Sequence, residues 1–404
     1  MNRMKKCNNM PAAAAGSTVY PVLFAISLAH LLNDMIQSVV PAIYPMLKEN
    51  YALTFGQIGL ITLVYQMTSS IFQPFVGLYA DRHPRPYSLA FGMCLTLAGL
   101  LTLAVSWNYG LILIAVGIIG CGSSIFHPES SRVAQMASGG RKSLAQSIFQ
   151  VGGNGGSAIG PLLAAIIVIP HGQGAVGWFA VAAFVAFAVL AGVGRWYSKT
   201  LMQRRREGSE HVAIAAPFPA NVVRRAMTIL VVMIFSKYFF ISSMTSYFTF
   251  FLIDKFGVSV QQSQICLFAF LAALAIGTLA GGFLGDRYGR KYVILFSIFG
   301  AAPFALALPY LNFGWTVVFS VVIGLVIASA FSAILVYATD LKPDKVGMVS
   351  GVFFGLMFGL GGIASAFFGW LADHTSVEFI FHVSTLLPLL GIIAIWLPDT
   401  RKAS

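Results

Sequence analysis

The sequence predicts an all-α integral membrane protein made of two related halves. Of its 404 residues, 58% are hydrophobic and only 9% are charged, and the mean hydropathy is +0.82. Too few charges remain to cover a globular surface of this size in water. Apolar runs of about twenty residues, the length that crosses a bilayer as a helix, follow one another along the chain. The lipid bilayer is therefore the expected environment of most of the protein.

Twelve transmembrane helices are expected, as two pseudo-symmetric six-helix bundles. The predicted spans are residues 20–47, 55–80, 87–106, 110–136, 143–170, 175–198, 225–253, 261–284, 291–311, 314–339, 347–372 and 376–397. The predicted organisation is a tail at 1–19, a bundle at 20–198, a linker at 199–224, a second bundle at 225–397 and a tail at 398–404. Residues 1–17 have too weak an apolar patch for a signal peptide, so the first span should be retained.

Basic residues collect in the loops on one side of the predicted membrane. When the spans are threaded alternately, all 25 Lys and Arg residues except Lys48, Lys237 and Lys255 fall on that side. This bias predicts that both termini and the linker are cytoplasmic. The net charge of +12 is then explained by the orientation of the protein in the membrane. No nucleic-acid partner is expected, because the basic linker has no interleaved aromatic residues.

The sequence offers no site for an enzyme. The HExxH and GxSxG patterns are absent, and so is the phosphate-binding loop that ATP-driven export requires. His127-Pro-Glu129 resembles a fragment of a zinc deaminase motif, but no Pro-Cys-x-x-Cys follows it. The four cysteines lie far apart and indicate neither disulfides nor a zinc site. We therefore expect no enzymatic activity, no metal and no organic cofactor.

One loop is repeated at about half the chain length. Gly77-Leu-Tyr-Ala-Asp81-Arg82-His-Pro-Arg85-Pro86 recurs as Gly282-Phe-Leu-Gly-Asp286-Arg287-Tyr-Gly-Arg290-Lys291, and the matched Gly, Asp and Arg residues are 205 positions apart. Glycine permits close helix approach, and aspartate accepts hydrogen bonds from backbone or Arg donors. Each loop is therefore predicted to latch helices within its own half, with the prolines at 84 and 86 making the first latch stiffer. The alternative is a topology signal alone.

These loops resemble the signature of the major facilitator superfamily, G-x-x-x-D-R-x-G-R-K, which joins the second and third helices of each half. The second copy matches throughout, whereas the first has Pro84 and Pro86 where the pattern has Gly and a basic residue. A narrower resemblance, to drug exporters of that superfamily, is carried by residues 31–38, 123–134, 146–154, 235–239 and 328–338.

That resemblance implies a monomeric secondary transporter of the bacterial inner membrane. It would export a small anionic phosphonate drug in exchange for protons, by alternating access, with the proton gradient as its energy source and without a cofactor. Proton-coupled uptake of a small organic anion is the alternative that the fold allows.

Ionisable residues inside the spans are candidates for the substrate and proton pathway, because a charge in hydrocarbon costs about 3 kcal/mol or more. His30, Asn33, Asp34 and Gln37 form one polar stripe on the first span, which should face the central cavity. Lys237 lies in the seventh span, the counterpart of the first. We interpret Asp34 as a proton carrier and Lys237 as the anchor of an anionic substrate. The alternative is a static ion pair between them.

The fourth span carries His127, Glu129 and Arg132, and Pro128 is expected to kink it. Glu129 and Arg132 are three residues apart and can pair on one helix face. The pair either braces this helix against the Asp81 loop, or Glu129 or His127 exchanges a proton while Arg132 meets the phosphonate. Both interpretations stay open, and the depth of Arg132 favours a structural role for it.

The fifth span combines polar and small residues. Gln150 and Asn154 are assigned to the pathway, together with Tyr238 of the seventh span. Gly156-x-x-x-Gly160-Pro161 resembles the glycine motif of superfamily antiporters. Such a row serves either plain helix packing or the sliding of helices in a transport cycle.

Overall fold

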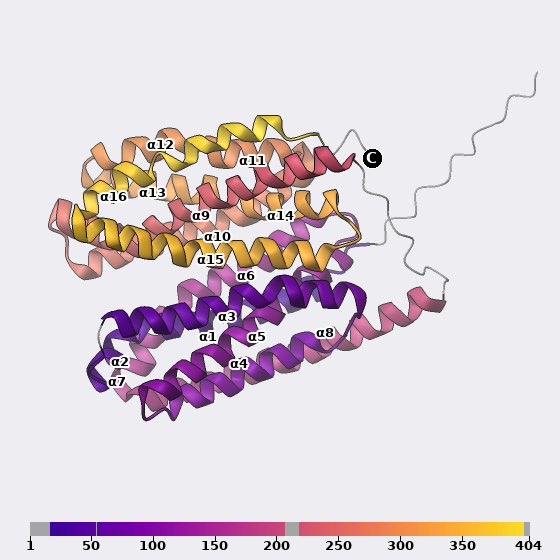
Figure 1. Ribbon diagram of the computed structural model, residues 1–404, viewed down its shortest axis with the longest axis horizontal. Helices are drawn as coiled ribbons and strands as arrows, with labels where there is room; N and C mark the ends of the chain where they lie inside the picture. Colours follow the sequence, from indigo (N-terminus) through magenta and orange to yellow (C-terminus); the bar gives the residue numbers. More distant parts are fainter. Residues whose placement is uncertain (1–16, 54, 207–217, 400–404) are drawn as a thin grey trace, which may run out of the picture.

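The computed structural model describes residues 17–53, 55–206 and 218–399, and within these ranges it is helical with no β-strand. Figure 1 shows two bundles side by side, one built from the helices up to α8 and the other from α9 onward. Among the described residues, ten helical stretches are long and apolar enough to cross a membrane, and a shorter apolar helix, Ser88–Ala104, accompanies them. The predicted all-α membrane fold is therefore confirmed.

The first bundle follows the order of the predicted spans. Its elements are α1 (Tyr20–Ala42), α2 (Tyr44–Asn50), α3 (Phe55–Arg82), α4 (Ser88–Ala104), α5 (Tyr109–Met136), α6 (Lys142–Leu163), η1 (Ala164–Val168), α7 (Ile169–His171), η2 (Gln173–Phe179) and α8 (Ala180–Arg206). The first span is interrupted after Ala42, just past Pro41, and the short α2 continues beyond it. A proline without an N–H group favours such an interruption.

The second bundle repeats this order. Its elements are α9 (Ala220–Phe256), α10 (Val260–Tyr288), α11 (Arg290–Phe299), α12 (Ala302–Ala307), η3 (Leu308–Tyr310), α13 (Phe313–Ala328), α14 (Ala330–Leu341), α15 (Val346–His374), α16 (Val377–Ser384) and η4 (Leu387–Trp396). Helix occupies both ends of the stretch predicted as a linker, because α8 continues to Arg206 and α9 begins at Ala220. The rest of that stretch, 207–217, lies outside the described residues, as do 1–16 and 400–404 of the predicted tails.

Helices α1 and α6 pack backbone to backbone inside the first bundle. Gly152, Gly156 and Gly160 recur every four residues on one face of α6. A Cβ atom on any of them would overlap α1, at Ser27, Leu31 and Ser38 respectively. The glycine row predicted at 156–160 therefore serves close packing within one half. In the second half, residues 204 positions later on α15 are Leu356, Leu360 and Ala364, and the glycine row of α15 lies one residue earlier, at 351, 355 and 359, where Gly351 and Gly355 stand against α3 of the first half.

The two bundles meet most closely at one end, where α3 ends and α15 begins. We call it the basic end, because the loops rich in Lys and Arg lie there. A Cβ atom added to Gly347 or Gly355 of α15 would come within 2.7 or 2.8 Å of a carbonyl oxygen of α3. At Gly359 and Gly362, further along α15, the nearest α3 atoms are at ordinary contact distances of 3.9 and 3.7 Å. The bundles therefore diverge away from the basic end, as Figure 1 also shows.

Candidate functional site

Asp34 lies between two histidines inside the first bundle. The Nε2 atom of His30, one turn earlier on α1, is 3.2 Å from Asp34 Oδ2, and the Nε2 atom of His127 on α5 is 3.8 Å from Asp34 Oδ1. Both histidines are fully buried, whereas the Asp34 side chain is 13% exposed. Asn33 donates a hydrogen bond of 3.0 Å to Asp34 Oδ1. We call His30, Asp34 and His127 the acid–base triad.

The contact of each Nδ1 atom determines which nitrogen of the two imidazoles carries the ring hydrogen. Nδ1 of His30 lies 2.8 Å from the Phe149 carbonyl, and Nδ1 of His127 lies 3.0 Å from the Ser123 carbonyl. A carbonyl oxygen only accepts, so both Nδ1 atoms must carry the hydrogen. In the neutral rings both Nε2 atoms therefore present a lone pair beside the Asp34 carboxylate, and the negative carboxylate repels it. The contact between Nε2 and the carboxylate is therefore favourable only when a further proton lies between the two atoms.

The same three groups could also hold a metal ion. Their ligand atoms all lie within 4.8 Å of one another, and metal-bound histidines commonly donate the second ring N–H to a carbonyl. The 3.2 Å distance between His30 Nε2 and Asp34 Oδ2 is also compatible with a shared proton, so the geometry by itself does not require a metal.

The predicted polar stripe on α1 faces the interior of the first bundle. His30, Asn33 and Gln37 are buried, and only Asp34 keeps part of its surface exposed. Gln37 accepts a hydrogen bond from the hydroxyl of Tyr65 on α3, which extends the polar network. Sequence reasoning missed Tyr65, because a tyrosine on an apolar helix carries no signal that separates a polar contact from packing.

Lys237 is a buried lysine in the second bundle. Its side chain is on α9, the residue is 2% exposed, and Nζ donates to the Ala328 carbonyl at 3.3 Å. The same atom lies 5.5 and 5.7 Å from the ring centroids of Tyr238 and Phe331. No ion pair to Lys237 occurs within residues 17–53, 55–206 and 218–399, so the pairing with Asp34 that we considered is not formed there. The ammonium group keeps donors for an anion.

Glu129 and Arg132 brace α5 against its neighbours. Glu129 is 1% exposed, accepts a hydrogen bond of 3.0 Å from Ser88 Oγ at the start of α4, and lies 3.9 Å from Arg132. Arg132 donates to the Ala80 carbonyl near the end of α3. Helix α5 runs as one continuous helix from Tyr109 to Met136, with Pro128, the position of the predicted kink, inside it. These contacts match the structural interpretation of the pair.

The remaining pathway candidates take different positions. Asn154 of α6 donates a hydrogen bond of 3.0 Å to the Thr278 hydroxyl of α10, and so joins the two bundles. Gln150 is buried, and its Oε1 atom has no hydrogen-bond partner among the described residues. Tyr238 packs edge-on against Phe331, with ring centroids 5.8 Å apart.

The aspartates of the repeated loops act between the halves. Asp81 accepts hydrogen bonds from the N–H groups of Gly347 (2.9 Å) and Met348 (2.8 Å), in the first turn of α15. Asp286 accepts from the N–H groups of Ser143 (3.2 Å) and Leu144 (2.9 Å), in the first turn of α6. For the aspartates, our prediction that each loop latches helices within its own half is therefore wrong, whereas Arg290, which donates to Asp340 of α14, does join two helices of its own half. The unpaired N–H groups and the positive dipole end at the start of α15 and of α6 attract these carboxylates.

The glycines of the two loops stand at these crossings. A Cβ atom on Gly77 would overlap the Gly347 carbonyl, and one on Gly282 would overlap the Ser147 side chain. Arg290 lies 3.6 Å from Asp286 and donates to Ser143 Oγ at 2.9 Å. Of the other basic residues of the loops, Arg82, Arg85 and Arg287 are exposed and Lys291 is half-buried.

Comparisons with known proteins agree with this architecture. The sequence profile described as Major Facilitator Superfamily matches residues 26–366 and 248–404. The chain is 55% identical over 395 residues to the fosmidomycin resistance protein of Escherichia coli (strain K12), covering 96% of this chain and 97% of the relative. It is 41% identical over 395 residues to an uncharacterized MFS-type transporter, YfnC, of Bacillus subtilis (strain 168), covering 96% and 95%.

A solved structure shares the fold. The transporter FucP, in the outward conformation, superposes with a TM-score of 0.73 at 15% identity, covering 96% of this chain and 100% of that one. The predicted resemblance to the superfamily is confirmed, and so is the prediction of a transporter and not an enzyme. The chain belongs to the major facilitator superfamily and is a multi-pass membrane transporter that resembles the fosmidomycin resistance protein.

Proposed function

We propose that the protein is a secondary active transporter that exports fosmidomycin, or similar small anionic phosphonate drugs, across the bacterial inner membrane by proton antiport. The observation that carries the proposal is the placement of two buried groups of opposite chemistry in opposite halves. The acid–base triad holds protons in the first bundle, and Lys237 offers an unpaired cation in the second. The identity of 55% to a fosmidomycin resistance protein supports this substrate class.

The proposed cycle alternates between two arrangements of the bundles. With the basic end in the cytoplasm, as the positive-inside bias predicts, the arrangement described above has the halves joined on the cytoplasmic side and apart on the other. Protons would reach Asp34 from outside while the anion leaves Lys237. Protons would then leave to the cytoplasm after the bundles rock about their interface, and the next anion would bind. Both termini would be cytoplasmic and the transporter would work as a monomer.

Asp34→Asn tests the proton role. The amide keeps the shape of the carboxylate but cannot share protons with the histidines, so we expect proton-driven transport to fall to background. Purified protein in vesicles with an imposed proton gradient reports fosmidomycin movement and internal pH together. Glu49→Gln, which changes an exposed acid on α2, is the matched control. Undiminished proton-coupled transport by Asp34→Asn would refute the assignment.

Lys237→Met tests the anion site. Removal of the buried charge should weaken binding of fosmidomycin by about 1.5–3 kcal/mol, the range for a hydrogen bond to a charged group. Titration calorimetry measures the affinity, and Lys199→Met, at an exposed lysine of α8, controls for loss of charge. An unchanged affinity would assign Lys237 a structural role.

The direction of drug movement in the vesicles described for Asp34→Asn separates export from the alternative, uptake of a small organic anion.

A further inference from the structure

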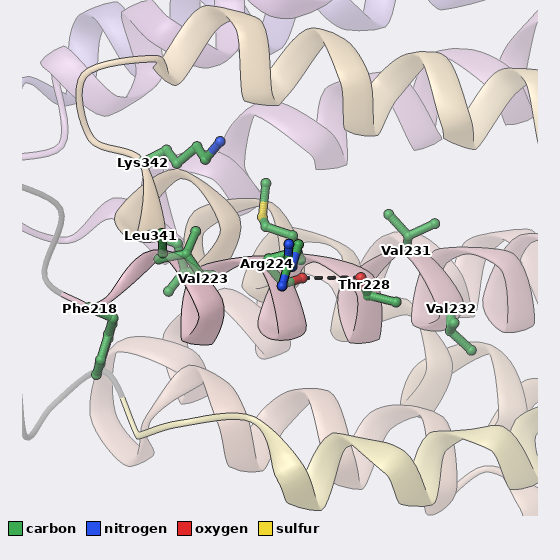
Figure 2. A pocket seen from close by; sticks show the side chains of 10 residues that line it. Phe218, Val223, Arg224, Thr228, Val231, Val232, Leu341 and Lys342 are labelled. Atoms are coloured by element: carbon green, nitrogen blue, oxygen red, sulfur yellow. Dashed lines mark hydrogen bonds between the residues drawn. The ribbon is translucent and has the colours of Figure 1, made fainter.

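An apolar groove lies on the second bundle, at the basic end of α9. Its volume is about 670 Å³, and it is lined by residues of α9, by Phe218 before that helix, and by Leu341 and Lys342 at the end of α14. Met227 and Val231 are one turn apart on the α9 wall, and Val231 is 37% exposed. Figure 2 shows Arg224 and Lys342 toward one end of the groove and Val231 and Val232 further along α9.

The internal repeat indicates that this groove opens to the bilayer. Arg224 and Thr228 are exposed, and their counterparts 204 positions earlier, Tyr20 and Phe24 of α1, are 39% and 61% exposed. This is the outer face of the helix in both halves. The groove lies on that face of α9, between this helix and the end of α14.

The charges at the groove are uncompensated. Among the described residues, neither Arg224 nor Lys342 forms an ion pair. Of the acids in the adjoining segment, Asp340 pairs with Lys142 and Arg290, and Asp344 forms no ion pair among the described residues. The groove therefore presents two cations at the membrane surface and an apolar track that leads into the bilayer. That pattern complements an amphiphile with an anionic head and a hydrocarbon tail.

We propose that the groove binds an anionic phospholipid, its phosphate against Arg224 and Lys342 and one acyl chain along Met227 and Val231. The lipid would also hold the segment after Lys342, which leads into the first turn of α15, where Gly347 and Met348 donate to Asp81. Bound lipid thus supports the joined arrangement of the halves at the basic end. This inference does not depend on which drug is transported or in which direction.

Lipid binding to the purified full chain tests the proposal. Phosphatidylglycerol is titrated into the protein in neutral detergent, and bound lipid is counted by native mass spectrometry. We expect phosphatidylglycerol to bind more tightly than phosphatidylcholine. The double variant Arg224→Gln/Lys342→Gln should bind it roughly 30-fold more weakly, from about 1 kcal/mol for each basic residue near an anionic headgroup. Arg225→Gln/Lys345→Gln removes the same charge from exposed neighbours that do not line the groove, and should bind as the wild type does.

A second variant tests the part of the groove that is proposed to hold the acyl chain. Val231→Glu places a charge where the chain should lie, at a side chain that is 37% exposed, and should also weaken phosphatidylglycerol binding. Equal binding of the two lipids, or equal losses of binding in the two double variants, would overturn the proposal. Displacement of the lipid by glycerol phosphate would also overturn it, because the site would then bind a soluble anion. So would tighter lipid binding after residues 207–217 are replaced by a Gly/Ser stretch, because that segment would then be the natural occupant of the groove. Thermal unfolding of each variant verifies that it is folded.

Discussion

The two repeated loops make the same contact by different means. In both, an aspartate caps the first turn of a helix in the opposite half. The second latch adds charges, because Asp340 binds both Arg290 and Lys142, which come from different halves, and the Lys142 contact is 2.8 Å. In the first latch the residue 205 positions before Asp340 is Gln135, which donates to the Thr339 hydroxyl at 3.0 Å. One latch is an ion network, whereas Asp81 of the other forms no ion pair among the described residues.

The backbones of the two loops differ as well. Gly289 alone separates α10 from α11, and its φ of 99° lies in the left-handed region that glycine tolerates. The equivalent position in the first loop is Pro84, whose ring fixes φ near −65°. The first loop cannot make that turn, and residues 83–87 separate α3 from α4. Duplicated halves can therefore keep a functional carboxylate while the turn that presents it changes. The greater stiffness of the first loop stays a prediction.

Asp286→Asn should have the largest effect on this comparison. It removes a charged cap from two N–H groups of α6 and a partner from Arg290, so we expect the joined arrangement to lose about 3 kcal/mol relative to the opened one. Spin labels at Tyr87 and Tyr292, exposed residues 205 positions apart near the two loops, report the distance between the halves. The distribution should shift toward longer distances. An unchanged distribution would mean that this latch does not hold the basic end together.

Asp81→Asn should have a smaller effect, about 2 kcal/mol, because it removes a cap of the same kind from α15 but no arginine pair within its own loop. The same labels give the measurement. A shift as large as that of Asp286→Asn would show that the ion network adds nothing to the second latch.

Lys142→Met should have the smallest effect, about 0.5–1 kcal/mol, since its side chain is 38% exposed and water screens the pair. High salt should reproduce this loss in the wild type and add little in the variant, because screening acts on the same ion pair. Distance distributions at low and high salt test this, with Lys199→Met as the control. Equal salt responses in Lys142→Met and wild type would exclude this pair as the source of the salt dependence.

Sequence reasoning identified the members of the acid–base triad but not their arrangement. His30 and Asp34 are four residues apart, and helical periodicity places them on one face. That His127 would reach the same carboxylate depends on how α5 is rotated against α1, and no local pattern encodes that rotation. Lys142, Asp340 and Thr278 gave no signal either, because each is an ordinary polar residue until the opposite half lies beside it.

The sequence by itself determined the membrane class, the duplication, the basic side of the protein and the polar residues within the spans. Composition, repeat distance and helical period are properties of the linear chain, so they could be read without coordinates. Only the tertiary structure decided that the two aspartates join opposite halves, that Asp34 meets two histidines instead of Lys237, and that α9 leaves a groove. These outcomes depend on packing between helices far apart in sequence, where glycine at a few positions lets two helices approach closely.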